Sequence, residues 1–576
     1  MQHNLHVRIA VVPGGGTAGL LARLRDDGTA DGQIQHVQDL AAAIASAERA
    51  GPVRWVWRST QLMYPALLRA AARVARCHDI DLTAALLAAR DGPAGELPDS
   101  ARQPPEQGRS DDGHALQLPF ESSADPKVAS QHDLSSLVDA HAGQLRGIAA
   151  DADPARFGLL AAAESAGGLA AAEMGAAGLP WRADIHDRLL TELLGPRPPV
   201  AAGPQLRPAR LAELAAEISD ALGAARPVNP DSPAQLLRAL SASGIRVRST
   251  RSAELRQIDH PVIGLVLQYK ELARLHAANG WSWLDNWVFD GRFRPEYVVG
   301  GVVSGRWASR GGGALQIPKL LRQAVIADPG WALVVADAAQ LEPRILAALA
   351  GDGAFAQAAN SDDLYAAVAA AIGADRPKAK VALLSAMYGG TGGDGGQSLA
   401  LLRRRFPQAS AFVESAARAG EEGRVVRSIL GRTCPPPSAA WRTLTSGPGD
   451  PEDQRDPAAG AAARARGRFT RNFVVQASAA DWALVLLAML RTRLAAMRPA
   501  GAADRPAAGE ALSAGSPQLV FFQHDEVVVH CPASLAGEVV AAIETAAAGA
   551  TRLVFGATEV SFPMTTAVVN CYADAK

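Results

Sequence analysis

The strongest constraint on the fold comes from acidic residues that follow or interrupt short apolar strands. The apolar run Trp331–Ala336 leads straight into Asp337. Much later in the chain, Leu519–Gln523 and Val527–Cys531 are also apolar, and they flank His524–Glu526. This pattern predicts one strand that ends in an aspartate and a tight β-hairpin that carries acids at its tip. Acidic side chains are therefore expected at strand ends in two distant segments of the chain.

Two aspartates held on rigid strands would suit a pair of divalent ions. Phosphoryl transfer with two metals needs ions about 4 Å apart, and magnesium prefers a few carboxylate ligands, with water and phosphate completing its shell. Asp337 and Asp525 are therefore candidate ligands for two Mg²⁺ ions. Each pattern taken alone is more often structural, because an aspartate after a strand commonly caps a helix and an acidic hairpin tip is commonly only solvated.

Length and composition set the limits of this interpretation. The chain has 576 residues, 48% of them apolar, which is enough for two to four folding units with substantial cores. It has no run of about 20 uncharged apolar residues and no signal for export, so we expect neither a membrane span nor secretion. Its four cysteines are far apart, which indicates reduced thiols in a cytoplasmic protein. A net charge of −1 argues against indiscriminate coating of DNA.

Local patterns divide the chain into segments. Residues 1–90 alternate apolar strands with helical stretches, as in α/β folds. Residues 91–131 are rich in Pro, Gly, Ser, Asp and Gln, which predicts a flexible segment. Residues 134–194 are expected to be largely helical. Two further helices are expected at Pro233–Ala242, which follows a good capping sequence, and at Ile263–Trp287.

Several blocks in the second half of the chain resemble the motifs of family A DNA polymerases, the bacterial polymerase I type. The block that begins at Asp337 reads Asp-Ala-Ala-Gln-Leu-Glu-Pro-Arg and is similar to motif A. His524–Glu526, between two apolar strands, is similar to motif C. Arg376–Gly389 resembles motif B. Two supporting stretches also lie where the family has them, Ser304–Pro318 before motif A and Arg468–Asp481 between motifs B and C.

The resemblance implies roles for individual residues. Asp337 and Asp525 would hold the two Mg²⁺ ions, and Glu526 would assist catalysis nearby. Glu342 would lie beneath the incoming sugar and favour deoxynucleotides over ribonucleotides. The residues implied to bind the incoming dNTP are Gln340, Glu342, Arg376, Lys380 and Tyr388. The residues implied to bind DNA are Arg306, Gln316, Arg468, Asn472, Gln476 and His524.

Helical spacing is compatible with two of these assignments. Arg376 and Lys380 are four residues apart, so both cations can reach one triphosphate. Asn472 and Gln476 have the same spacing, and polar side chains in the minor groove can check base-pair geometry without reading sequence, because purine N3 and pyrimidine O2 accept hydrogen bonds in every pair. For each of the four residues, an ordinary helix-surface contact is the alternative.

Several positions depart from the family pattern, among them Ser385 in place of the usual glycine and the position after Gln316, where the usual asparagine is absent. Leu384 stands where motif B usually has an aromatic residue, and Gln523 stands where an apolar residue usually precedes the histidine. Tyr365 stands where many relatives have histidine. None of these changes removes a candidate metal ligand, but the missing ring at Leu384 leaves sugar discrimination and nucleotide affinity open.

The resemblance also implies an architecture of class α/β (α+β). It is a right-hand polymerase with palm, fingers and thumb, preceded by an RNase H-like domain of the 3′–5′ exonuclease type. The strand Val7–Pro13 has no acid where such exonucleases carry an Asp-x-Glu pair, and His78–Thr83 only vaguely resembles their second block. We therefore expect a degenerate domain that does not cleave. The expected boundaries are 1–145 for the exonuclease-like domain, 150–290 for the thumb and the start of the palm, 291–352 for the palm with motif A, 353–467 for the fingers and 468–576 for the palm with motif C.

The implied partners are primer-template DNA and dNTPs. The protein is expected to be a monomer that works in the cytoplasm at the nucleoid, in replication or repair synthesis, and to join dNTPs to a primer 3′-hydroxyl with release of pyrophosphate. One alternative is a single-subunit RNA polymerase, against which Glu342 counts because such enzymes need room for the 2′-hydroxyl. The other is a non-catalytic DNA-binding relic, against which the presence of both Asp337 and Asp525 counts.

Overall fold

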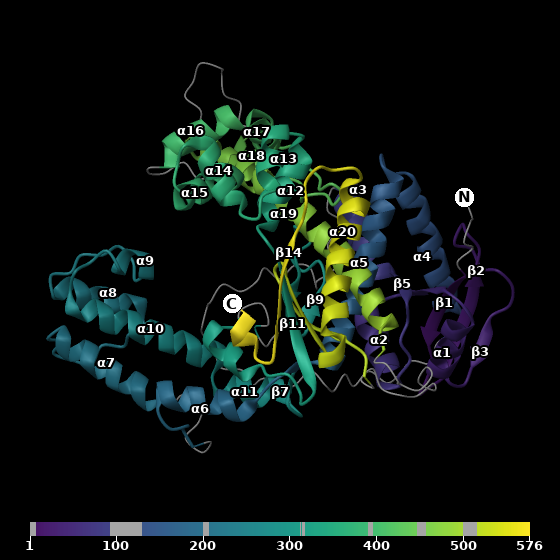
Figure 1. Ribbon diagram of the computed structural model, residues 1–576, viewed down its shortest axis with the longest axis horizontal. Coiled ribbons are helices and arrows are strands. Elements are labelled where there is room, and N and C mark those ends of the chain that lie inside the picture. Colours follow the sequence, from purple (N-terminus) through teal and green to yellow (C-terminus); the bar gives the residue numbers. More distant parts are fainter. Residues whose placement is uncertain are drawn as a thin grey trace. The chain divides into compact units, whose positions relative to one another are not determined.

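A computed structural model of the chain shows two compact units (Figure 1). The first unit consists of Met1–Ala177, Glu296–Arg310 and Gly330–Val568, and the second of Gly178–Pro295, Gly311–Pro329 and Val569–Lys576. The segment predicted to be flexible, 91–131, lies almost entirely outside the described residues, and so does Gln316. The residues that the structure describes are 7–92, 130–199, 207–310, 313, 317–389, 395–445, 457–498 and 515–575.

The first unit begins with a five-stranded sheet in the order β3-β2-β1-β4-β5. Strand β1 is antiparallel to β2 and parallel to β4, which is itself parallel to β5. Side chains of β1 alternate between two cores: Ile9 packs in one with residues of α1 and α2, and Ala10 in the other with residues of α4. These elements are β1 (Val7–Pro13), β2 (Gly19–Leu24), β3 (Gln35–Val37), α1 (Leu40–Ala50), β4 (Val53–Trp57), α2 (Thr60–Arg69), β5 (Arg76–Asp79), α3 (Ile80–Asp91) and α4 (Gln131–Ala149).

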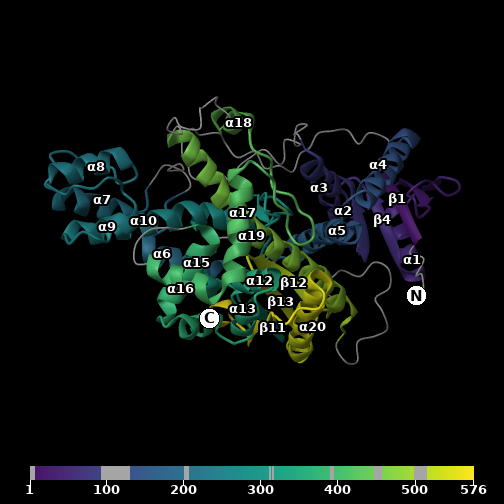
Figure 2. The same cartoon turned by 90° about the horizontal axis from the view of Figure 1, so that it is seen from above.

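A second sheet of the first unit has the order β12-β13-β11-β14 (Figure 1, Figure 2). Strand β13 is antiparallel to both β11 and β12. Helix α20 packs against β11 and β13, and the long helices α5 and α19 pack against β12. The predicted hairpin around His524 is confirmed. These elements are α5 (Pro154–Ala177), β11 (Trp331–Ala338), α19 (Pro457–Ala496), β12 (Gln518–Gln523), β13 (Glu526–Pro532), α20 (Ala536–Phe555) and β14 (Met564–Val569).

A group of helices follows β11 in the chain and packs on α19 within the same unit. Helix α15 carries the motif B residues, and its N-terminus is capped by Asp375, which accepts a hydrogen bond from the backbone N–H of Lys378 at 2.7 Å. The members of the group are α12 (Leu341–Ala350), α13 (Gly353–Ala359), α14 (Leu364–Ile372), α15 (Arg376–Tyr388), α16 (Gly395–Arg405) and α17 (Pro407–Glu421).

The second unit is mainly helical. The helix predicted at Pro233–Ala242 is confirmed as α8, with Ser232 as its cap. The helix predicted over Ile263–Trp287 is divided at Gly280 into α10 (Pro261–Asn279) and α11 (Trp281–Trp287). A Cβ atom on Gly280 would lie 2.3 Å from the carbonyl oxygen of His276, so the turn between the two helices requires glycine.

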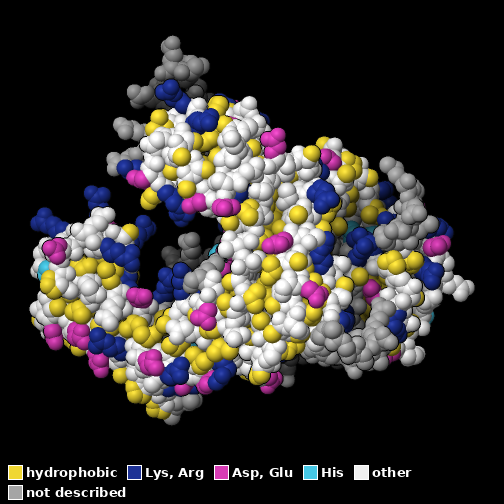
Figure 3. Space-filling view, viewed as in Figure 1, with side chains coloured by type: hydrophobic (Ala, Val, Ile, Leu, Met, Phe, Trp, Pro, Cys, Tyr) yellow, Lys and Arg dark blue, Asp and Glu magenta, His cyan; other side chains and the backbone are white. Residues whose placement is uncertain are grey.

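Exposed arginines gather on the second unit around α8 and α9. Figure 3 shows Lys and Arg side chains in dark blue over these helices. The other elements of the unit include a small sheet of β6 (Leu179–Pro180), β8 (Arg292–Phe293) and β7 (Val288–Phe289), and the helices α6 (Ala183–Leu194), α7 (Ala209–Ala221) and α9 (Ser252–Leu255). The arginines are Arg238, Arg246, Arg248, Arg251 and Arg256.

Two helical segments of the described chain are long and apolar enough to cross a membrane by length and composition alone, namely Pro457–Ala496 and Ala533–Phe555. The most apolar stretch of the first helix is 83% buried inside the protein, and that of the second is 50% buried. Core helices pass the same test, so these helices are weak evidence for a membrane span. The expected absence of a membrane partner stays a prediction.

Candidate active site

The pairing of β11 with β13 brings the predicted acidic residues to one end of the sheet. Asp337, at the penultimate position of β11, lies directly opposite Glu526, the first residue of β13. The backbone N–H of Ala338 donates a hydrogen bond to the carbonyl oxygen of Asp525 at 3.1 Å. The backbones of Asp337, Asp525 and Glu526 are therefore neighbours although the first is far from the other two in sequence.

The local backbone explains why these acids sit at the ends of strands. His524 adopts a left-handed conformation with φ +58° and, with Asp525, forms the tight turn between β12 and β13. The five strand residues before Asp337 are all buried, whereas Asp337 itself is half-buried. A rigid apolar support thus ends in a polar tip, as the sequence pattern predicts.

The donor set at this end of the sheet suits a hard cation. It consists of carboxylate oxygens, which Mg²⁺ prefers, and magnesium usually completes its coordination shell with water or other oxygen ligands. Within the described segments, no three His, Cys, Asp or Glu side chains form a ready-made metal cluster. The carboxylates of Asp337 and Asp525 fit a divalent ion in their chemistry.

Glu342 is the centre of a polar network beside these acids. Its carboxylate accepts hydrogen bonds from the Arg306 guanidinium and from the Tyr388 hydroxyl. Burial raises the pKa of Tyr388, and the bond to Glu342 raises it further. Burial lowers the pKa of His524, as does the nearby charge of Arg306. Residues predicted to contact the nucleotide and the DNA are thus joined around one carboxylate.

Gln340 and Arg376 are both engaged by Asp363, a residue that the sequence analysis did not single out. The side-chain amide of Gln340 donates to Asp363 at 3.1 Å and accepts from the backbone N–H of Leu364 at 2.8 Å. The Arg376 guanidinium forms an ion pair with Asp363, which holds the pKa of that carboxyl below its usual range. Lys380 lies one turn further along α15, on the exposed side of that helix.

Arg344 holds the turn after Asp337 in place, a role that its position in motif A does not reveal. It is only 1% exposed and donates hydrogen bonds to backbone carbonyl groups. The sequence does contain a signal for this role. Arg344 stands among apolar residues of its helix, and an arginine that is buried there needs several hydrogen-bond acceptors. These carbonyl groups belong to Ala339, Ala359, Ser361, Asp362 and Ser561.

Helix α19 carries the remaining predicted DNA-binding residues on one face. Arg468 is exposed, and Asn472 and Gln476 are half-buried. A Cβ atom on Gly389, at the end of α15, would lie 2.8 Å from the Arg468 side chain, so this face of α19 lies against the end of α15. Tyr388 and Gln476 are also close, since a hydrogen bond to Gln476 opposes the rise in the pKa of Tyr388.

Comparisons with known proteins identify relatives of this chain. The model of the family "DNA polymerase family A" matches residues 205–568. DNA polymerase I of Thermus filiformis is 26% identical over 52% of this chain and 35% of its own length. DNA polymerase I of Chloroflexus aurantiacus is 25% identical over 52% of this chain and 31% of its own length. The matched region thus spans about a third of the length of these relatives.

A solved structure shares the fold. It is described as the POL domain of Pol1 from M. smegmatis in complex with DNA primer-template and dNTP. It superposes with a TM-score of 0.66 at 18% identity and covers 99% of this chain and 96% of its own. The mixed α/β class predicted from the sequence is thereby confirmed.

Proposed function

The chain belongs to DNA polymerase family A, and we propose that it is a DNA-directed DNA polymerase that extends a primer on a DNA template. The observation that carries the proposal is the pairing of Asp337 with Glu526, which places Asp525 beside them. A family member that had become a passive DNA-binding protein would have no need for acids at this position.

The proposed reaction is attack by the primer 3′-oxygen on the α-phosphorus of a dNTP. A bond forms between that oxygen and phosphorus, the bond from the α-phosphorus to the bridging oxygen breaks, and pyrophosphate leaves. Two Mg²⁺ ions, when bound by Asp337 and Asp525, would supply electrostatic stabilisation of the attacking and leaving oxygens. Glu526 would assist from its buried position beside them.

Other residues of the site would orient the substrates. Arg376 and Lys380 would hold the triphosphate. The network of Glu342, Arg306 and Tyr388 would line the sugar and the nascent base pair. Because Glu342 is fixed by two partners, it would occupy the space that a 2′-hydroxyl requires, which favours dNTPs and disfavours the RNA polymerase alternative.

Primer-template DNA is the proposed partner. The DNA-binding set would comprise Arg306, His524 and the α19 residues Arg468, Asn472 and Gln476, with Gln316 from the undescribed part of the chain. Exposed arginines around α8 and α9 would bind backbone phosphates without regard to sequence. We propose that the protein acts as a monomer on nucleoid DNA in the cytoplasm, in replication or repair synthesis.

The N-terminal sheet is proposed to have lost proofreading. Strand β1 carries no carboxylate, and Asp79, in the vague remnant of the second exonuclease block, uses its carboxylate to cap helix α3. The domain would then serve as structure alone.

Primer extension tests the proposed function. The purified protein should extend a labelled primer with dNTPs and Mg²⁺, and Asp525→Asn should reduce the rate by about a thousandfold or more without changing the unfolding temperature. Asp139→Ala, at an exposed position on α4, is the matched control and should keep full activity. Extension by the Asp525→Asn protein at the normal rate would refute the assignment.

A further inference from the structure

One tyrosine ring contacts both of the cations that are proposed to bind the triphosphate. The guanidinium carbon of Arg376 lies 5.7 Å from the centroid of the Tyr365 ring, and the Lys380 ammonium lies 5.6 Å from it. The tyrosine is only 8% exposed, whereas both cations lie on the exposed side of α15. A buried aromatic platform therefore supports two solvent-facing charges.

The position of the ring is fixed by the start of helix α14. Asp363 caps this helix by accepting hydrogen bonds from the backbone N–H groups of Tyr365 at 3.1 Å and Ala366 at 3.2 Å. The same carboxylate pairs with Arg376 and accepts from the amide of Gln340 at 3.1 Å. The ring and the arginine are thus positioned by one common anchor.

The Tyr365 ring offsets the repulsion between the two cations on α15. Two like charges four residues apart on a helix repel each other, so Arg376 and Lys380 would tend to move apart in the absence of a nucleotide. The negative face of an aromatic ring attracts both cations. Burial raises the pKa of the Tyr365 hydroxyl, as does the carboxylate of Glu342, so the ring stays neutral and adds no negative charge that would repel a triphosphate.

We propose that Tyr365 is a positioning residue for nucleotide binding, because its ring holds Arg376 and Lys380 at a fixed spacing before the triphosphate arrives. This inference rests on the proposed function and deepens it. Cations that are already in place lose less freedom on binding, so the platform increases affinity for the nucleotide. The effect belongs to the ring and not to the hydroxyl group.

The test compares Tyr365→Leu, which removes the ring, with Tyr365→Phe, which keeps it. Binding of Mg·dATP is measured by titration calorimetry on a complex with a dideoxy-terminated primer and a templating thymine, and KM and kcat are measured in parallel on an extendable primer. Tyr365→Leu should raise both Kd and KM roughly three- to tenfold and leave kcat within about twofold. Tyr365→Phe should stay within about twofold of the wild-type protein.

A control variant removes another cation from α15 and tests whether any electrostatic change on this helix weakens nucleotide binding. Lys378 lies on α15 and pairs with Asp375 at 3.2 Å, so Lys378→Ala should leave the affinity for dATP unchanged. The proposal is overturned if Tyr365→Leu binds dATP like the wild type, or if Tyr365→Phe loses as much affinity as Tyr365→Leu. It is also overturned if Tyr365→Leu weakens primer-template binding in the absence of nucleotide to the same degree.

Failure of the proposed function gives a different result. In that case the wild-type protein would not extend the primer at all, whichever residue stands at position 365. A wild-type protein that extends primers, together with a Tyr365→Leu protein of unchanged KM, would leave the polymerase function intact and refute only the platform.

Discussion

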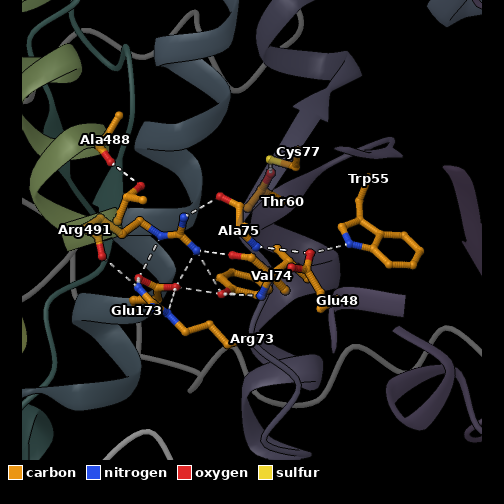
Figure 4. A network of polar contacts seen from close by, with 12 residues as sticks. Glu48, Trp55, Thr60, Arg73, Val74, Ala75, Cys77, Glu173, Ala488 and Arg491 are labelled. Atoms are coloured by element: carbon orange, nitrogen blue, oxygen red, sulfur yellow. Dashed lines mark hydrogen bonds and ion pairs between the residues drawn. The ribbon is translucent and has the colours of Figure 1, made fainter. Parts of the chain in front are cut away.

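Glu173 and Arg491 form a buried ion pair between helices α5 and α19, although they are 318 residues apart in sequence. The guanidinium donates to both carboxylate oxygens, at 2.7 and 2.8 Å. Arg73, from the N-terminal α/β part, donates to the same carboxylate (Figure 4). The Tyr64 hydroxyl, from the same part, also donates to it. The helix that carries Asn472 and Gln476 is therefore bonded directly to the N-terminal α/β part.

Breaking this pair should destabilise the first unit. Burial alone would raise the pKa of Glu173, but the two arginines lower it to about 2, so the carboxylate stays charged and needs its partners. Arg491→Leu would also leave the carbonyl groups of Val74 and Ala75 without this donor. We expect a loss of about 3–5 kcal/mol in the free energy of unfolding, measured by urea denaturation of the full chain.

An exposed ion pair provides the control for this prediction. Arg188 and Glu192 lie 3.7 Å apart on α6, and both side chains are more than 60% exposed. Arg188→Leu should change the free energy of unfolding by no more than about 0.5 kcal/mol. Equal effects of the two substitutions would show that the buried network contributes no special stability.

The sequence predicts local elements well because their signals are local. The hairpin at His524–Glu526 and the helix Pro233–Ala242 follow from strand alternation and from capping residues, and both are confirmed. The convergence of Asp337 with Asp525 could be inferred only from the resemblance to a family, because strand pairing across the chain leaves no trace in periodicity.

Long-range polar partners could not be predicted. Arg432 bonds to Glu164, 268 residues away, and to Asp481, within a buried cluster. The sequence predicts that a buried arginine needs hydrogen-bond acceptors, but the residues next to it in the chain do not identify these acceptors. For the same reason the anchoring role of Asp363 was missed, since its partners Gln340 and Arg376 come from two other elements.

Sugar selection should depend on the size of the Glu342 side chain. Glu342→Ala should reduce the preference for dATP over ATP roughly 10- to 100-fold, because it opens the space that a 2′-hydroxyl needs. The measurement is the ratio of kcat/KM for the two nucleotides. Glu342→Gln keeps the volume and should preserve most of the preference, although it weakens the contacts with Arg306 and Tyr388. Unchanged discrimination by Glu342→Ala would contradict this assignment.

Acid should destabilise the N-terminal sheet through two buried histidines. Burial lowers the pKa of His78 to about 4, and burial together with the neighbouring His78 lowers that of His141 to about 3. Their rings lie 4.7 Å apart. Since the folded state keeps both rings neutral while the unfolded chain binds protons below about pH 6.5, stability falls as the pH drops from 6.5 towards 4.

The size of this acid effect can be measured with a variant. At pH 5 each ring should cost about 2 kcal/mol of stability relative to pH 7.5. His141→Leu, which cannot take up a proton, should show a shallower fall in the free energy of unfolding between pH 6.5 and 5. His132→Leu, at an exposed position on α4, should keep the wild-type pH profile. Identical slopes for His141→Leu and the wild type would exclude His141 as the cause.

The proposed loss of proofreading can be tested at Asp79, which lies in the segment that vaguely resembles the second exonuclease block. Its Oδ2 accepts from the backbone N–H of Thr60 at 2.6 Å and its Oδ1 from that of Leu82 at 2.9 Å, and the residue is 1% exposed. A carboxylate that is buried and bonded through both oxygens is poorly available to a metal ion. Asp79→Ala should therefore cost about 1–2 kcal/mol of stability through the lost cap.

Nuclease activity should be absent both with and without Asp79. The purified wild-type protein, given Mg²⁺ and a primer with a mismatched 3′ end but no dNTPs, should leave the primer at full length, and Asp79→Ala should behave identically. The Asp337→Asn variant distinguishes cleavage at the polymerase site from cleavage at a second active centre. Cleavage that depends on the polymerase site would be lost in this variant, whereas cleavage at a second centre would remain. Shortening of the mismatched primer that persists in Asp337→Asn and is lost in Asp79→Ala would show that the N-terminal domain still cleaves, with Asp79 as a metal ligand after all.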